Sequence, residues 1–246
     1  MMHPLAQQLG IQTYCFRVYQ TQEELFDALK ACGINRMELW PGHYNPADRD
    51  DQKEFLLRCA NEGIIISTLG VIGFSDETVA RKLFEFGKMA GFDTINVDFT
   101  VEQIPFVEEL CDEYDMRVMV HNHGRRHRWG PVVELEKLFK ATSPNVGLCL
   151  DTAWMLDSGE NPVEVAKHFQ DRLYGVHIKD FVFDRAGKPE DVIVGTGNLN
   201  LPGLLGFLAK TNYTGSLTLE YEGDYNDPIP ATKQCVEAVQ AVFETL

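Results

Sequence analysis

Short apolar runs alternate with longer amphipathic segments along the chain. The runs are rich in Val, Ile, Leu and Phe, which is typical of strands buried on both faces. They predict β-strands over residues 11–16, 36–40, 64–69, 94–99, 117–121, 146–151, 173–178 and 216–221. A sheet built from such strands must be covered by other elements, because its apolar faces are unstable in water.

The segments between these runs repeat apolar residues at intervals of three and four, as one face of a helix does. Thr21 with Glu24 has the pattern of a capping box, and Asn161 before Pro162 is typical of a helix start. Helices are predicted over residues 21–32, 51–61, 76–89, 102–114, 132–140, 201–210 and 230–246, with one more beginning at Asn161. A long loop is expected over residues 184–200.

Eight strand–helix units within 246 residues predict a (β/α)8 TIM barrel. No proline- or serine-rich linker interrupts the alternation. Residues 1–246 are therefore expected to form one domain.

Polar residues occupy the last inward positions of several predicted strands. In the run 216–221, Leu217 and Leu219 alternate with Thr218 and Glu220. If the leucines pack against helices, the other set must face the barrel interior. Glu220 then lies at the C-terminal end of its strand, where the active sites of such barrels form.

Four strand ends combine this inward position with a side chain that binds metals: His121, Asp151, His177 and Glu220. Adjacent strands lie about 4.8 Å apart, so these four side chains can meet at one ion. Two imidazoles and two carboxylates suit Mn²⁺, Co²⁺, Fe²⁺ or Zn²⁺ better than Ca²⁺, with Mg²⁺ as a further candidate. Each residue alone is more often a hydrogen-bonded or solvated side chain. Their shared position on four strands favours a divalent metal site.

The sequence around three of these residues resembles a known family. Segments 150–152 (Leu-Asp-Thr), 176–180 (Val-His-Ile-Lys-Asp) and 219–222 (Leu-Glu-Tyr-Glu) resemble the xylose isomerase-like TIM-barrel superfamily. That superfamily includes sugar-phosphate isomerases, ketose 3-epimerases, inosose and dehydroshikimate dehydratases, and family-2 apurinic endonucleases. The resemblance implies that Asp151, His177 and Glu220 bind a divalent metal.

The end of the fifth predicted strand departs from the family's pattern. Many members carry Glu-Asn-His there, and that Glu is both a metal ligand and the catalytic base. This chain has His121, Asn122 and His123 instead, a form also found in a branch of sugar isomerases. The resemblance gives His121 the ligand position and makes His123 a candidate for catalysis or substrate contact. It also argues against a mechanism with two equivalent glutamates.

Further polar residues are expected near the barrel mouth. Glu38 and Lys179 have inward positions and are candidate catalytic groups, Glu38 as an acid or base and Lys179 near substrate hydroxyls or a developing oxyanion. An ion pair between Glu38 and Arg36 is the alternative for that carboxylate. Trp40 and Asp98 are candidate substrate contacts, with Trp40 as an apolar wall against a sugar ring.

A cationic cluster, Arg125, Arg126 and Arg128, follows the fifth strand. Arg125 is a candidate substrate-binding residue, because guanidinium groups clamp phosphate or carboxylate by paired hydrogen bonds. Salt bridges to acidic neighbours, or a solvated loop, are the more usual arrangement for such a cluster. Residues 195–197 (Gly-Thr-Gly) are expected to form a plain turn rather than a phosphate cradle.

Charge and cysteine content narrow the functional classes. The formal net charge of −15 disfavours binding to nucleic acid and to anionic membranes, and no apolar run approaches the length of a membrane helix. The six cysteines lie far apart without Cys-x-x-Cys, so they are expected to be buried free thiols in a reducing compartment. Residues 1–6 lack the pattern of a secretory signal, and a cytoplasmic location is expected. Assembly into a homo-oligomer is left open.

These features predict a metal-dependent isomerase or epimerase that acts on a small keto sugar or sugar phosphate. A metal would chelate a carbonyl and a neighbouring hydroxyl oxygen and stabilise an ene-diolate. The alternative is a dehydratase, similar to inosose dehydratase, that removes the same proton and then expels a β-hydroxyl. A three-zinc DNA-repair endonuclease, which the net charge disfavours, and a non-catalytic sugar-binding protein are further alternatives.

Overall fold

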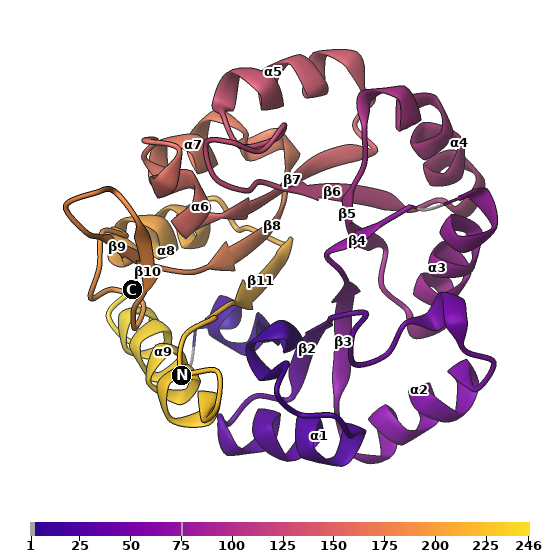
Figure 1. Ribbon diagram of the computed structural model, residues 1–246, viewed down its shortest axis with the longest axis horizontal. Helices are drawn as coiled ribbons and strands as arrows, with labels where there is room; N and C mark the ends of the chain where they lie inside the picture. Colours follow the sequence, from indigo (N-terminus) through magenta and orange to yellow (C-terminus); the bar gives the residue numbers. More distant parts are fainter. Residues whose placement is uncertain (1–2, 75) are drawn as a thin grey trace.

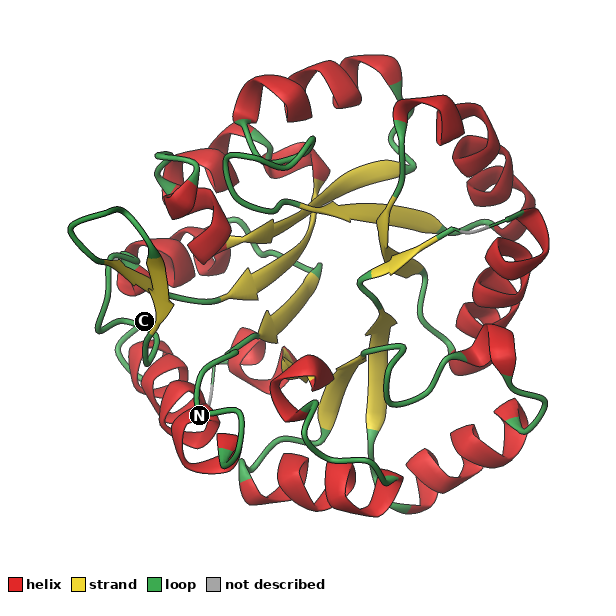
Figure 2. Ribbon diagram, in the orientation of Figure 1, coloured by secondary structure: helices red, strands yellow, loops and turns green. Residues whose placement is uncertain are grey.

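Parallel strands form a ring, and helices surround it on the outside (Figures 1 and 2). The computed structural model describes residues 3–74 and 76–246. Around the ring the strand order is β3-β2-β1-β11-β8-β7-β6-β5-β4, and every neighbouring pair is parallel. The predicted (β/α)8 barrel is therefore confirmed. Residues 1 and 2, part of the segment in which no secretory signal is expected, lie outside the described residues.

The strands of the ring agree closely with the predicted runs. They are β1 (Leu9–Gln12), β2 (Arg36–Leu39), β3 (Ile65–Leu69), β4 (Ile72–Gly73), β5 (Thr94–Asp98), β6 (Arg117–His121), β7 (Val146–Asp151), β8 (Leu173–Ile178) and β11 (Ser216–Leu219). The helices are α1 (Gln22–Ala31), α2 (Gln52–Asn61), α3 (Glu77–Ala90), α4 (Ile104–Tyr114), α5 (Val132–Ala141), α6 (Thr152–Asp157), α7 (Pro162–His168), α8 (Leu201–Lys210) and α9 (Pro228–Phe243).

Barrel closure occurs where the third strand position is divided into β3 and β4. β3 pairs with β2, while the two-residue β4 pairs with β5. Thr68 of β3 donates a side-chain hydrogen bond of 2.7 Å to the carbonyl of Thr94 on β5, which bridges the seam. Gly70 sits in the turn between β3 and β4, where a Cβ atom would lie 2.2 Å from the carbonyl oxygen of Asn96. Only glycine allows this close approach.

Strand parity separates the core from the barrel interior as the sequence predicts. Val118 and Val120 of β6 face the helices and are fully buried. Asn96 of β5 and Thr218 of β11 face inward and are also fully buried. The main hydrophobic core therefore lies between the ring and the helices, and the ring interior is left for polar groups.

Three local predictions need correction. The predicted strand over residues 11–16 ends at Gln12, because the Gln12 side chain accepts the Tyr14 N–H and starts a 3-10 helix at Thr13–Phe16. The expected loop over 184–200 instead contributes β10 (Pro189–Asp191), which forms an antiparallel hairpin with β9 (Phe181–Phe183). The last helix covers Pro228–Phe243 rather than residues 230–246.

Two expectations from composition can be compared with the structure. All six cysteines are buried free thiols, as predicted. Across residues 3–74 and 76–246, the helices are each too short or too polar to cross a bilayer.

Candidate metal centre

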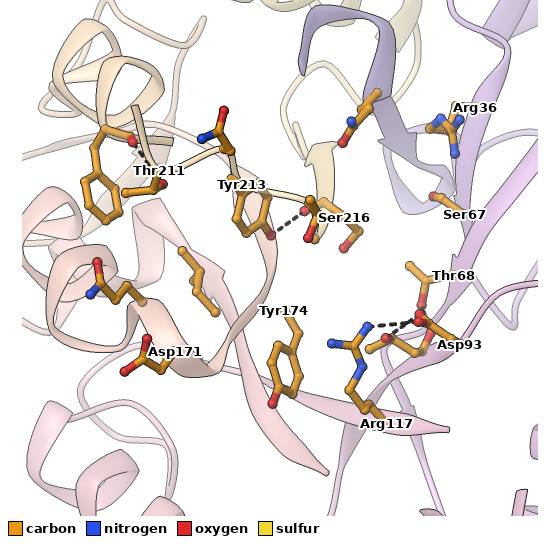
Figure 3. Close-up of a pocket in the computed structure, with 18 residues that line it drawn as sticks. Arg36, Ser67, Thr68, Asp93, Arg117, Asp171, Tyr174, Thr211, Tyr213 and Ser216 are labelled. Carbon is orange, nitrogen blue, oxygen red and sulfur yellow. Dashed lines mark hydrogen bonds and ion pairs between the residues drawn. The ribbon is translucent and has the colours of Figure 1, made fainter. Parts of the chain in front are cut away.

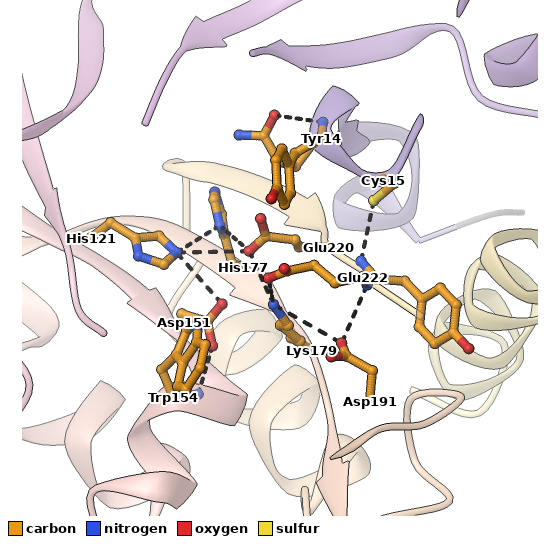
Figure 4. A network of polar contacts seen from close by, with 12 residues as sticks. Tyr14, Cys15, His121, Asp151, Trp154, His177, Lys179, Asp191, Glu220 and Glu222 are labelled. Carbon is orange, nitrogen blue, oxygen red and sulfur yellow. Dashed lines mark hydrogen bonds and ion pairs between the residues drawn. The ribbon is translucent and has the colours of Figure 1, made fainter. Parts of the chain in front are cut away.

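The structure brings His121, Asp151, His177 and Glu220 together inside the barrel (Figure 4). They come from the ends of β6, β7 and β8 and from the residue after β11. One nitrogen or oxygen atom of each side chain lies within 4.8 Å of the corresponding atoms of the other three. All four residues are buried, so their mutual approach is enforced by the surrounding barrel.

The spacing of these atoms fits the coordination sphere of a divalent ion. His121 Nε2 lies 3.1 Å from His177 Nδ1, 3.5 Å from Asp151 Oδ2 and 3.7 Å from Glu220 Oε2. Ligands at about 2.1 Å from a tetrahedral zinc ion lie roughly 3.4 Å from each other. Most of these atoms are acceptors, and Asp151 Oδ2 is buried without any hydrogen-bond donor. A cation at the centre would satisfy them.

Asp151 is oriented by the backbone around it. Its Oδ1 atom accepts the N–H of Trp154 at 2.8 Å and thereby caps α6, which leaves Oδ2 directed at the cluster. The Asn122 side chain accepts the Asp151 N–H at 2.8 Å and donates to the Asp151 carbonyl at 3.0 Å. Asn122 therefore locks the ends of β6 and β7 together, which is a role that strand parity alone does not reveal.

His177 is held from behind by Glu38. Its Nε2 atom lies 2.8 Å from Glu38 Oε2, and its Nδ1 atom faces the cluster. Glu38 is fully buried, and its other oxygen accepts hydrogen bonds from Gln12 and Asn96. A carboxylate that accepts one imidazole N–H fixes the tautomer in which the other nitrogen can bind a metal. The alternative pairing of Glu38 with Arg36 is not found.

Glu220 is an ionised carboxylate at the edge of the cluster. Burial raises its pKa, but Lys179 together with hydrogen bonds from His121 and His177 lowers that pKa well below the usual range. Lys179 Nζ lies 3.9 Å from Glu220 Oε2 and also pairs with Glu222. Lys179 is 1% exposed, so this buried cation compensates the negative charge of the two carboxylates.

A cavity of about 260 Å³ opens directly above the cluster. Its walls are formed by Gln12, Tyr14, Trp40, Val71, His121, His123, Trp154, Glu220 and Glu222. Trp40, a predicted substrate contact, packs edge-on against Tyr14 with the ring centres 5.0 Å apart. The cavity thus combines aromatic walls with acid–base groups, as sites for small polar ligands do.

His123 lies beside this cavity rather than in the cluster. Its ring centre is 4.6 Å from that of His121, and its Nδ1 atom is buried without a partner. Burial, together with His121 and His127, lowers the pKa of His123 to about 3. A neutral imidazole therefore faces the space next to the metal centre.

Arg125 and Asp98 are each occupied by a partner from the protein. Arg125 forms a paired hydrogen bond with Asp157, with its closest contact at 2.8 Å. Asp98 pairs with Arg128 at 2.7 Å. The alternative of salt bridges from the cationic loop to acidic neighbours is thus observed, and substrate contacts by Arg125 and Asp98 remain predictions.

The turn at residues 195–197 is also held internally. The N–H groups of Gly195 and Gly197 both donate to Asp180 Oδ2 at 2.9 Å. These donors are therefore engaged by a carboxylate of the chain itself. This arrangement agrees with the expected plain turn.

Some site residues were not found from the sequence. Trp154 lies on α6, a short helix that the hydrophobic periodicity did not predict. Asp151 caps this helix by accepting the Trp154 N–H, and aspartate is a common residue at that position. Asp191 lies on the unpredicted hairpin strand β10, 4.0 Å from Lys179. Glu222 lies in segment 219–222, which resembles the family, but nothing else in the sequence indicated that it belongs to the site.

The comparisons with known proteins agree with this architecture. The family model of the xylose isomerase-like TIM barrel matches residues 95–242. Inosose dehydratase from Clostridium botulinum is 30% identical over 135 residues, which cover 47% of this chain and 44% of that protein. The chain therefore matches less than half the length of this relative.

Two solved structures share the complete fold. The IolI protein with a bound zinc atom superposes with a TM-score of 0.77 at 14% identity, covering 96% of this chain and 98% of that one. The 3-keto-D-glucoside 4-epimerase YcjR of E. coli gives a TM-score of 0.73 at 16% identity, covering 95% and 99%. With more than half of its length matched by the family model, the chain belongs to the xylose isomerase-like TIM barrel family.

Proposed function

We propose that the protein is a divalent-metal-dependent isomerase or epimerase of a small keto sugar. One observation carries this proposal: four side chains place metal-binding atoms within 4.8 Å of one another, and two of the four, His121 and Glu220, line an accessible cavity. Glu220 belongs to both the cluster and the cavity wall, so a basic oxygen lies where a bound substrate would be. A small sugar is the proposed partner of this chain.

A divalent metal held by His121, Asp151, His177 and Glu220 would act as a Lewis acid on the substrate's carbonyl and adjacent hydroxyl oxygens, which acidifies the C–H bond between them. Glu220 is the proposed base for this proton, because its low pKa keeps it ionised. Lys179, fixed by Glu222 and close to Glu220, stabilises the negative charge on that side of the cavity.

An epimerase also needs a group that returns the proton to the opposite face of the carbon. His123 fits this role as a relay: its neutral imidazole on the cavity wall would release the proton of one ring nitrogen to the carbon while the other ring nitrogen takes up a proton from water. Trp40 would pack against the apolar face of the sugar ring and hold the carbon between the two groups.

Dehydration is the second candidate function, and the similarity to inosose dehydratase favours it. The first step would be the same removal of a proton next to a ketone by Glu220. His123 would then relay a proton from water to a departing β-hydroxyl group instead of to the carbon. The two reactions thus share a base and differ in the acceptor of the second proton.

Substitution of Glu220 by Gln tests the shared step. With Mn²⁺ supplied, proton NMR in D₂O should show solvent deuterium entering the α-carbon of a reactive keto sugar or inosose with the unaltered protein. We expect Glu220→Gln to slow this exchange by at least about 100-fold. Glu237→Gln, on the exposed side of α9, should leave it unchanged. Normal exchange in Glu220→Gln would remove Glu220 as the base.

The same spectra separate the two candidate functions. An epimerase gives a new sugar stereoisomer of unchanged mass, whereas a dehydratase gives a product lighter by one water. Loss of water without any epimer would replace the first candidate by the second.

A further inference from the structure

A second large cavity lies at the opposite end of the barrel from the metal centre (Figure 3). It has a volume of about 950 Å³ and is formed where the strands begin. Arg36, Thr94, Arg117 and Ser216 are the first residues of β2, β5, β6 and β11, and all four line it. No part of the proposed reaction uses this cavity.

Arg36 is the unusual residue in this cavity. Its Nε atom is buried without a hydrogen-bond acceptor, and within residues 3–74 and 76–246 its guanidinium group has no ion-pair partner. Buried N–H donors are nearly always paired in folded proteins, and an exception calls for an acceptor that binds there. An anionic acceptor forms the strongest hydrogen bonds with a guanidinium group.

The charged residues of the cavity wall are two arginines and two aspartates, but they are unevenly distributed. Arg117 is the second guanidinium of the cavity, and it pairs with Asp93 at 2.9 Å while it stacks on Tyr174. Asp93 is thus already neutralised, and its other oxygen accepts the Thr94 hydroxyl at 2.9 Å. Asp171 lies on the far side of the cavity from Arg36 in Figure 3. The charge of Arg36 is therefore not balanced by a carboxylate on its own side of the cavity.

The rest of the wall is polar rather than apolar. Ser67 and Tyr213 donate their hydroxyl protons to backbone carbonyls, so their oxygens remain available as acceptors. Among residues 3–74 and 76–246, the side-chain amide of Gln8 has no hydrogen-bond partner, so it can serve as donor or acceptor. Such a wall suits the hydroxyl groups of a ligand whose anionic end is held by Arg36.

We propose that this cavity binds a phosphate group, with Arg36 as its principal ligand and Arg117 as a second donor. A planar guanidinium such as that of Arg36 donates paired hydrogen bonds to two phosphate oxygens, and Arg117 has further N–H groups besides the one that Asp93 accepts. The cavity is much larger than inorganic phosphate, and the ligand is the phosphate monoester of a small polyhydroxylated molecule. Its binding stabilises the folded barrel, since the cavity exists only in the folded chain.

Thermal unfolding and calorimetric titration of the full chain test the proposal, with inorganic phosphate and ribose 5-phosphate as separate probes. At a hundredfold excess over its Kd, either probe should raise the unfolding midpoint by on the order of 5 °C. The monoester should bind more tightly. Arg36→Met, which keeps the side-chain stem, should weaken binding at least about tenfold, and Arg36→Lys should restore part of it.

Two controls locate the effect. Arg185→Met removes an exposed arginine from the β9–β10 turn and should bind both probes normally. Asp151→Asn impairs the metal centre, and phosphate should still stabilise it, which separates this site from the proposed catalytic function. Absence of any shift in the unaltered protein would overturn the proposal. Equal shifts in Arg36→Met and Arg185→Met would also overturn it, because phosphate would then bind elsewhere.

Discussion

At the scale of single residues, Glu38 determines how His177 can act. The Glu38 carboxylate is fully buried and makes three side-chain contacts, to His177, Gln12 and Asn96. These contacts place it behind the imidazole rather than in the cavity above it. We therefore propose that Glu38 has a positioning role through His177, a candidate metal ligand.

Glu38→Gln should weaken metal binding while the fold is retained. Glutamine keeps the size of the side chain but loses the charge that favours the metal-binding tautomer of His177. We expect the affinity for Mn²⁺ or Zn²⁺ to fall about 10- to 100-fold, measured by calorimetric titration. Glu190→Gln, an exposed residue on β10, serves as the control. Unchanged metal affinity in Glu38→Gln would contradict the positioning role.

Asp98 should contribute to stability through its ion pair with Arg128. Burial raises the pKa of Asp98, but hydrogen bonds from His127 and Arg128 lower it to about 2, from an ordinary 3.8. A lowered pKa stabilises the folded state above pH 4, and this contribution is lost as the pH falls towards 2. Asp98→Asn should therefore reduce the free energy of unfolding by about 2 kcal/mol at pH 7 and by almost nothing at pH 2.

Urea unfolding across this pH range measures the effect. The same substitution is also made in the Arg128→Gln variant. There Asp98→Asn should reduce the free energy of unfolding by a smaller amount, because its ion-pair partner is already absent. A pH-independent loss would show that packing rather than charge explains the role of Asp98.

At the scale of elements, a single carboxylate organises the segment after β10. Asp180 accepts N–H groups from four residues of this segment: Gly195, Gly197, Asn198 and Leu199. The hairpin β9–β10 lies between Asp180 and that segment, so the same contacts anchor the hairpin that carries Asp191. A buried carboxylate satisfied by several backbone donors is a strong local constraint.

Asp180→Asn should loosen this segment selectively. The amide keeps one acceptor oxygen and loses the charge, so two backbone donors become poorly satisfied. We expect a loss of about 2–3 kcal/mol in the free energy of unfolding. Hydrogen exchange should accelerate at residues 195–199 but not in β6 or β7. Uniform acceleration across the barrel would contradict a local anchor.

At the scale of the whole molecule, the barrel separates two polar sites with different chemistry. The candidate metal centre lies at the C-terminal ends of the strands, and the phosphate cavity proposed above lies at their N-terminal ends. Inward side chains between them, including Glu38 and Asn96, belong to the network behind His177. Each site can therefore be altered without changing the residues of the other.

Removal of metal should destabilise the entire barrel, because the four ligands come from separate strands. We expect chelation to lower the unfolding midpoint by on the order of 5–10 °C and addition of about one equivalent of metal to restore it. Asp151→Asn should be nearly insensitive to chelator. Three bound metal ions per chain would contradict a single metal centre and would favour the alternative of a three-zinc endonuclease.

Much of this architecture followed from local sequence patterns. Periods of two and of three to four residues predicted the strand–helix alternation, and strand parity predicted that His121, Asp151, His177 and Glu220 face inward. These features depend on residues close together in the chain, whose positions on one face are fixed by regular backbone geometry.

Other features depended on contacts between distant segments. The partners of Glu38 come from β1, β5 and β8, and the cationic loop found Asp157 and Asp98 as partners only in the folded chain. Likewise, Arg36 Nε has no hydrogen-bond acceptor among the described residues, which depends on how distant segments pack around it. Sequence periodicity determined which side chains point into the barrel, whereas tertiary packing decided which of them touch, because those distances arise only when the ring closes.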